Sequence, residues 1–351
     1  MSLNMSLFYV FTHSFNLPDE YKCPENLTVS TVPRPLLGSY FLASGIVFIT
    51  LYFPCFLAIL KLNLKIPVYQ LMLVLSIFDI AALSIQSQLE SLIYGIWFCQ
   101  YPLPIFLYGA VGQTCWMSGS ACSILLAVKR CVEINPKFPL EILFRKSVFP
   151  FVLVALILFS LWCFLFVKPV LFSVILSSWI YNPLIGTNPE LYDSNPDTIC
   201  NIVLVVTTSL LYIYLSYNLI FKFGFSTSIW LYKTKRQIIF QAIILCVFHA
   251  IVAGLYEFMR FFYYSPTLII ISQVLWGWSS GCMCIAYLTF NRTIRNLVKK
   301  IIIPKSIRMR YGIHGDFEEH LAHTEAAHNV GTGIVNAGGC VIRIDNFIHF
   351  D

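Results

Sequence analysis

Apolar and polar positions follow one another in long blocks along this chain, and seven apolar runs are separated by stretches that hold most of the charges. About 20 apolar residues at a rise of 1.5 Å cross ~30 Å of hydrocarbon, so each run predicts a membrane-spanning helix. The predicted spans, with approximate ends, are residues 36–60, 68–97, 104–131, 147–167, 199–221, 238–263 and 266–290.

The third span differs from a simple anchor in its composition. Between Pro104 and Val128 it has no Asp, Glu, Lys or Arg, and small residues such as Gly and Ser are frequent. Small residues let neighbouring helices approach closely, so this helix is expected inside a bundle. It ends in Lys129 and Arg130, which gives it a basic foot at the membrane surface.

A shorter amphipathic pattern follows the seventh span. In residues 291–303 the apolar positions recur at spacings of three and four, with cations between them. This predicts an eighth, interfacial helix lying on the inner leaflet and ended by Pro304. The remaining tail, residues 304–351, contains several His, and a solvated flexible tail is the preferred interpretation over a metal site. No metal or other cofactor is expected.

Composition agrees with a polytopic membrane protein. The chain is 58% hydrophobic and only 11% charged, whereas soluble domains average about 25% charged residues. A net charge of +6 in a soluble protein would suggest an acidic partner such as nucleic acid. Here the cations follow the predicted topology instead, so no nucleic-acid partner is expected.

The distribution of cations predicts the orientation. Eighteen Lys and Arg residues fall on one side of the seven spans and three on the other, apart from Arg260 and Arg343. The positive-inside rule then places the N-terminus outside the plasma membrane and the C-terminus in the cytoplasm. Residues 1–35 are an extracellular segment in this topology, and Asn26 is its candidate glycosylation site.

The long loop at residues 168–198 is also predicted to lie outside. It has three Asn-Pro turn signals, is expected to be irregular, and carries Glu190, Asp193 and Asp197 at its tip. Of the twelve cysteines, only Cys23, Cys99 and Cys200 are plausible partners in an outer disulfide. A bridge from Cys99 to Cys200, at the exit of the loop, is preferred, and Cys23 is the alternative.

Two carboxylates lie within the second span at different depths. Asp79 is near the middle of the membrane, and Glu90 is about 16 Å further out along the helix. A charge at the bilayer centre costs at least ~2.5 kcal/mol, so Asp79 must face the bundle. It either binds a cation there or is protonated and hydrogen-bonded.

Several stretches of the sequence resemble one receptor family. They are PVYQLMLVLSIFDI, FCQYP, ILLAVKRCVEI, EFMRFFYYSPTLIIISQVLWGWSSG and, most specific of them, YLTFNRTIR at residues 287–295. Together they resemble the nematode serpentine receptor class T family of chemoreceptors. The resemblance implies an all-α membrane protein with a seven-transmembrane-helix G-protein-coupled-receptor bundle. It also implies a chemosensory receptor for a small molecule that activates a heterotrimeric G protein, with sensory cilia as one location.

The resemblance implies roles for single residues where they match. Arg130 is similar to the arginine at the end of the third helix that faces the G protein, but its usual acidic neighbour is replaced by Lys129. Glu133, one turn further on, is a possible substitute partner. A Lys-Arg pair that only sets topology is the alternative reading. Tyr287 and Arg292 are further candidates for activation and coupling.

A second set of residues follows from the same resemblance. Asp79 resembles the second-helix aspartate that binds sodium in many rhodopsin-like receptors. The ligand site is expected in the extracellular half of the bundle, where spans two, three, six and seven bring polar groups together. The ligand-binding candidates are Glu90, Gln113, Trp116, Tyr256, Glu257, Arg260, Gln273 and Trp276. Glu257 and Arg260, three residues apart, could instead pair with each other.

Two other classes of membrane protein remain as alternatives. A secondary transporter usually has an internal repeat and broken helices, and no repeat is evident. A seven-span ligand-gated channel with its N-terminus inside disagrees with the cation distribution. An enzyme is not expected. The sequence has no cluster of His, Cys, Asp or Glu with metal-ligand spacing, and no Ser-His-Asp set whose members lie at the same depth in the membrane.

Overall fold

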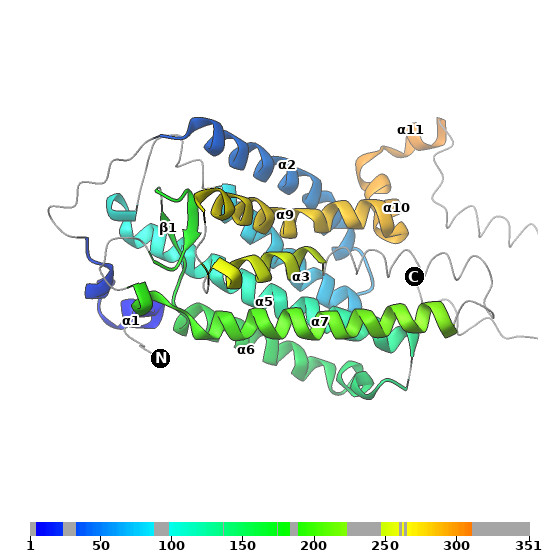
Figure 1. The fold of residues 1–351 in the computed structure, drawn as a ribbon. Coiled ribbons are helices and arrows are strands. Elements are labelled where there is room, and N and C mark those ends of the chain that lie inside the picture. Colours follow the sequence, from blue (N-terminus) through cyan, green and yellow to red (C-terminus); the bar gives the residue numbers. More distant parts are fainter. Residues whose placement is uncertain are drawn as a thin grey trace, which may run out of the picture.

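The computed structural model describes residues 5–23, 33–87, 98–135, 137–173, 175–182, 189–222, 247–259, 262 and 265–310. These residues form a bundle of long helices that run roughly along one direction (Figure 1). The segment before the first long helix lies at the end that we call the N-terminal end of the bundle. The short helices that follow the last long helix lie towards the end that we call the opposite end.

Six of the described helices are long and apolar enough to cross a membrane. They are α2 (Pro35–Leu60), α3 (Pro67–Ser87), α5 (Pro102–Ile134), α6 (Phe149–Phe166), α7 (Asn195–Lys222) and α9 (Pro266–Phe290). A shorter apolar helix, Val247–Met259, lies within the sixth predicted span. Helices α2, α5 and α9 have Pro in their first turn, where its missing N–H leaves no hydrogen bond unmade.

Helix α5 occupies the interior of the bundle and contacts α3, α6 and α7. Its small residues Gly109, Gly112, Ser118 and Gly119 are buried. The position of Gly109 shows why: a Cβ there would overlap the carbonyl oxygen of Val170. The glycine at position 109 therefore allows backbone to pack against backbone, whereas side chains are the nearest neighbours of Gly112 and Gly119.

Outward faces of the bundle are apolar. On α7, Ile199, Val206, Leu210 and Ile213 are each more than half exposed and recur at helical spacing. On α6, Phe151 is 73% exposed. Contiguous exposed apolar stripes of this size fit lipid and not water.

The amphipathic helix α10 (Arg292–Ile302) packs differently from the prediction. Its apolar residues Ile294 and Val298 are buried in the core cluster shared with α2, so much of its apolar face lies against protein and not against the inner leaflet. Ile302 at its end is 61% exposed. A further short helix, α11 (Lys305–Arg310), follows Pro304 at the start of the predicted tail.

The N-terminal segment is folded onto the bundle. It contains α1 (Leu7–Thr12) and the 3-10 turn η2 (Asp19–Tyr21), and Met5, Leu7 and Val10 are fully buried. A disulfide joins Cys23 to Cys99, with their Cα atoms 5.8 Å apart. The preferred pairing of Cys99 with Cys200 is thus wrong, since Cys200 is a free thiol; the alternative, Cys23, is the partner.

The long loop predicted to be irregular contains an antiparallel hairpin. Strands β1 (Leu171–Ser173) and β2 (Ser178–Ile180) pair with Phe172 opposite Trp179. Arg34, at the start of α2, holds the turn by donating to Ser177 Oγ at 2.7 Å and to the Ile175 carbonyl at 3.2 Å. The hairpin lies at the N-terminal end of the bundle (Figure 1).

Candidate functional site

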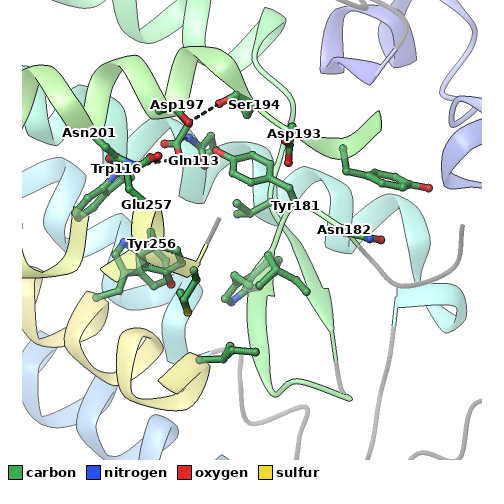
Figure 2. A pocket seen from close by; sticks show the side chains of 18 of the residues that line it. Gln113, Trp116, Tyr181, Asn182, Asp193, Ser194, Asp197, Asn201, Tyr256 and Glu257 are labelled. Atoms are coloured by element: carbon green, nitrogen blue, oxygen red, sulfur yellow. Dashed lines mark hydrogen bonds between the residues drawn. The ribbon is translucent and has the colours of Figure 1, made fainter. Parts of the chain in front are cut away.

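A cavity of about 400 Å³ opens inside the N-terminal end of the bundle. Its walls come from α5, α7, α9, the helix Val247–Met259 and the β1–β2 hairpin. Figure 2 shows the side chains that surround it. A volume of this size is typical of pockets for small organic molecules.

The cavity brings together most of the predicted ligand-binding residues that the structure describes. Gln113, Trp116, Tyr256, Glu257 and Trp276 all line it. The other three candidates have different outcomes. Glu90 and Arg260 lie outside the described residues, and Gln273 is fully buried behind the wall and is not a lining residue.

Gln273 positions the hairpin. Its Oε1 accepts hydrogen bonds from Ser178 Oγ at 2.9 Å and from the backbone N–H of Trp179 at 3.2 Å. Tyr256 Oη donates to the same oxygen at 3.5 Å. One amide oxygen on α9 therefore fixes strand β2 and a cavity-lining tyrosine at once.

A polar network on the other wall connects three helices. Gln113 Nε2 on α5 donates to Asp197 Oδ1 on α7 at 2.8 Å. Asn201 Nδ2, one turn further along α7, donates to Asp197 Oδ2 at 3.3 Å and to Glu257 Oε1 at 2.9 Å. Trp116 Nε1 donates to Asn201 Oδ1 at 2.9 Å, which completes the connection back to α5.

Asp197 and Asn201 were missed as candidate site residues. The sequence pattern predicts Asp197 at the tip of an outer loop, but Asp197 lies in the first turn of α7 and is only 9% exposed. The signal was available: Asn195, Pro196 and Asp197 give a capping residue, a proline at the first helical position and an acid in the first turn. Asn201 follows Asp197 by four residues, on the same helix face.

Tyr181, directly after β2, faces this network. Its ring points toward Asp197 in Figure 2, and its hydroxyl is buried with no hydrogen-bond partner of normal geometry in the described part of the chain. Burial, and then the nearby charge of Asp197, raise the pKa of Tyr181 well above its ordinary value. The phenol therefore stays protonated and available as a donor at physiological pH.

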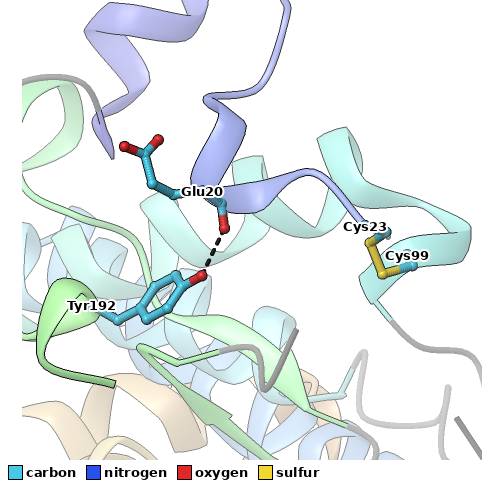
Figure 3. The surroundings of a disulfide bond; sticks show 4 residues. All are labelled: Glu20, Cys23, Cys99 and Tyr192. Carbon is cyan, nitrogen blue, oxygen red and sulfur yellow. Dashed lines mark hydrogen bonds between the residues drawn. A yellow bond between two sulfur atoms is a disulfide. The ribbon is translucent and has the colours of Figure 1, made fainter. Parts of the chain in front are cut away.

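The N-terminal segment closes this end of the bundle. Tyr192, which lines the cavity, donates from its hydroxyl to the carbonyl of Glu20 at 2.7 Å (Figure 3). The ring of Tyr21 packs against those of Phe106 and Tyr192. The Cys23–Cys99 disulfide then ties the end of this segment to the turn before α5. We call residues 5–23 the N-terminal strap.

Asp79 lies in a second buried polar group, near the middle of the bundle. It is 4% exposed and accepts a hydrogen bond of 2.8 Å from Tyr52 Oη, and Ser280 lies beside it. The ring of Tyr287 packs edge-on against Tyr52, and its buried hydroxyl has no partner among the described residues. Ser118 Oγ on α5 is likewise buried and unpartnered there.

The opposite end of α5 carries an ion pair. Arg130 donates to Glu133 Oε2 at 2.7 Å, and Lys129 approaches the other oxygen of Glu133 at 3.7 Å. The substitute partner suggested by the sequence is therefore the one that Arg130 contacts. Arg292 is the first residue of α10. Asn291, directly before it, caps the helix, and its Oδ1 accepts a hydrogen bond from the N–H of Ile294 at 3.1 Å.

Comparison with known proteins decides the family. The family description "Serpentine type 7TM GPCR chemoreceptor Srt" matches residues 5–311, which is most of the chain. The chain belongs to the Srt family. A relative, the Serpentine receptor class T-55 of Caenorhabditis elegans, is 22% identical over 264 residues, which cover 74% of this chain and 72% of the relative.

Membership of the Srt family identifies the observed helices as spans of a seven-transmembrane protein. The chain is an all-α, multi-pass membrane protein of a seven-transmembrane chemoreceptor family, and a receptor type rather than an enzyme. The helix Val247–Met259 is then the described part of the sixth span. The resemblance stated from the sequence is confirmed at the level of the family and fold.

Proposed function

We propose that this Srt protein is a G-protein-coupled chemosensory receptor whose small-molecule ligand binds in the cavity at the N-terminal end of the bundle. Binding there is relayed to a heterotrimeric G protein at the opposite end, around Arg130. The observation that carries the proposal is the position of α5, which supplies residues at both places. Gln113 and Trp116 line the cavity, and Arg130 lies about 20 to 26 Å further along the same helix.

To carry a signal along α5, some part of the protein must switch between two conformations. The network of Asp197, Asn201 and Glu257 joins α7 and the sixth span to Trp116 on α5. A ligand that displaced one of these hydrogen bonds would favour a different relative position of the three helices. Arg130 and Arg292 form the proposed coupling surface, and the buried Tyr287 is proposed to take part in activation from inside the bundle.

The proposed orientation puts the cavity outside the cell and Arg130 in the cytoplasm. Its support is the distribution of eighteen Lys and Arg residues on one side against three on the other. The plasma membrane is the proposed location, with sensory cilia as a place where a chemoreceptor meets its ligands. Residues 304–351 then form a cytoplasmic tail.

Asp79 is proposed as a cation or proton site inside the bundle. The groups around it are oxygens, from Tyr52 and Ser280, and oxygen ligands suit a hard cation such as sodium. Ser118 lies one turn before Cys122 on α5, and Cys122 Sγ donates to the carbonyl of Leu71 on α3, the helix that carries Asp79. The unpartnered hydroxyl of Ser118 fits the same interpretation.

The test compares signalling at equal surface density. Arg130→Ala should abolish and Arg130→Lys should weaken G-protein activation, because a guanidinium binds carbonyl oxygens as a planar fork and an ammonium does not. Lys129→Ala is the matched control and should change signalling little. If Arg130→Lys signalled like the wild type, the basic pair would only set topology, and this part of the proposal would fall.

A second arm of the test concerns the cavity. At Gly112 a Cβ would meet only ordinary contacts with Ile85 and Trp276, so Gly112→Ala should be tolerated. Gly112→Leu would extend into the cavity beside Trp276 and should block any activating ligand. A receptor with Gly112→Leu that responded normally to such a ligand would place the ligand elsewhere.

A further inference from the structure

We propose that the cavity recognises organic molecules that carry a protonated amine. This inference rests on the proposed function, since it names the class of ligand for the same cavity. It stands on three features of the wall: its charged residues, its unpartnered polar atoms and its aromatic surface.

The charges on the wall all have one sign in the part of the chain that the structure describes. Twenty-one described residues line the cavity, and they include Asp193, Asp197 and Glu257 but no Lys, Arg or His. Asp197 and Glu257 approach each other closely enough for one amide nitrogen, Asn201 Nδ2, to donate to both. Asp197 is buried and Glu257 is half-buried, and no cation among the described residues pairs with either carboxylate. This arrangement is unfavourable, because each carboxylate loses hydration and each repels the other.

Several polar atoms of the wall have no hydrogen-bond partner among the described residues. Glu257 Oε2 is buried and accepts no hydrogen bond within the described residues. Ser194 is only 4% exposed, and its hydroxyl is likewise unpartnered there. Buried polar atoms are nearly always satisfied in folded proteins, so these exceptions need an explanation. A ligand ammonium, with up to three N–H donors, would supply what a carboxylate oxygen and a hydroxyl oxygen lack.

Aromatic rings cover much of the remaining wall. Seven of the lining side chains are aromatic, among them Trp116, Trp179 and Trp276. The negative faces of such rings attract cations, and their area buries the apolar body of a ligand. A neutral ligand would gain from the rings but not from the carboxylates, and an anionic ligand would be repelled by both. The combination therefore favours an organic cation over the other two classes.

The experiment uses the full-length receptor in lipid nanodiscs and measures its thermal unfolding midpoint. The probes are two matched sets that differ only in the polar group. They are phenethylamine, phenethyl alcohol and hydrocinnamate, and tryptamine, tryptophol and indolepropionate. We expect at least one amine, at millimolar concentration, to raise the midpoint while its alcohol and acid partners do not.

Variants then tie the effect to the two carboxylates. Glu257→Gln and Asp197→Asn keep shape but remove charge, and each should weaken the apparent affinity for the amine about 10- to 100-fold, as for a lost hydrogen bond to a charged group. Asp19→Asn removes an exposed charge that pairs with Lys22 on the N-terminal strap, and it should leave the affinity unchanged.

Three outcomes would overturn the inference. The first is an equal shift by amine and alcohol that survives in Glu257→Gln, which would mean that a shared proton, and not a ligand cation, neutralises the carboxylates. The second is a shift by the acids alone that is lost in Arg260→Ala, which would assign the site to anions. In either case a shift abolished by Gly112→Leu would leave the proposed ligand-binding function intact. If no probe of any class acted, the inference about the ligand class would fail, while the Gly112→Leu and Arg130 variants would still decide the proposed function.

Discussion

Arg130 and Glu133 form an ion pair of 2.7 Å one turn apart on α5, with only 15% and 22% of their side chains exposed. The acid lies after the arginine and not directly before it, where Lys129 stands. Because the two side chains are largely withdrawn from water, removing one partner of this pair costs more than breaking an exposed pair. The pair holds the side chain of Arg130, the proposed coupling residue, against α5.

Removing the acid should therefore release Arg130. We expect Glu133→Gln to raise ligand-independent G-protein activation several-fold, because the free guanidinium can turn toward the G protein. A reporter assay at matched surface density measures this. Glu141→Gln is the control, since it breaks an exposed pair with Arg145 at 3.1 Å in the neighbouring connection. Equal basal activity in both variants would mean that the Arg130–Glu133 pair restrains nothing.

The Cys23–Cys99 disulfide should be essential for the N-terminal strap. It closes a loop of 76 residues, which contributes about 4 kcal/mol in the chain-entropy model. Cys23→Ser should lower the thermal midpoint, and it should expose the strap to limited proteolysis. Peptide mapping without reductant checks the connectivity and should recover Cys23 linked to Cys99. Recovery of a peptide that links Cys99 to Cys200 would restore the pairing preferred from the sequence alone.

Glycosylation tests the proposed orientation. Of the three sequons of the chain, Asn4 and Asn26 lie on one side of the predicted membrane and Asn291 lies on the other. Asn26 is outside the described residues, and Asn291 caps α10 through its side-chain oxygen. Asn26→Gln should abolish a glycosidase-sensitive mass, whereas Asn291→Ser, which keeps a capping oxygen, should not change it. A glycan lost on Asn291→Ser would invert the topology.

Sodium should distinguish the two states proposed for Asp79. If the carboxylate binds sodium, sodium should raise the thermal midpoint of the receptor above its value in potassium at equal ionic strength. Asp79→Asn should remove that difference, and Asp197→Asn, a second buried carboxylate, should retain it. No difference between the salts in the wild type would favour a protonated Asp79 that only accepts the hydrogen bond from Tyr52.

The pattern of apolar and polar residues along the chain predicted the helices of the fold well. Membrane-length apolar runs gave the helices, and local spacing gave α10, because both depend on residues that are neighbours in the chain. The sequence also suggested Glu133 as the partner of Arg130, since three residues on a helix make one turn. Gln113, Trp116, Tyr256, Glu257 and Trp276 were found by their depth in the membrane, which a count along each helix estimates.

What the sequence did not predict depends on contacts between distant segments. Asp197 looked like a loop residue because Gln113, which donates to it, lies 84 positions away, and Glu257, which shares the Asn201 donor with it, lies 60 positions away. The hairpin depends on Arg34 and Gln273, which lie outside the loop, so its local composition suggested only turns. Cys200 was preferred for its position after the loop, but folding of residues 5–23 onto the bundle brings Cys23 to Cys99 instead.

The N-terminal strap must fold late although it is synthesised early, because the residues that bury it come later in the chain. Phe8 is synthesised long before Phe166, the ring that it packs against. Tyr192, which receives the strap at Glu20, follows Glu20 by 172 residues. At ordinary rates of translation this is roughly ten to thirty seconds. The apolar side chains of the strap therefore stay uncovered during this time, and the strap completes its folding only after the chain has been made as far as Tyr192.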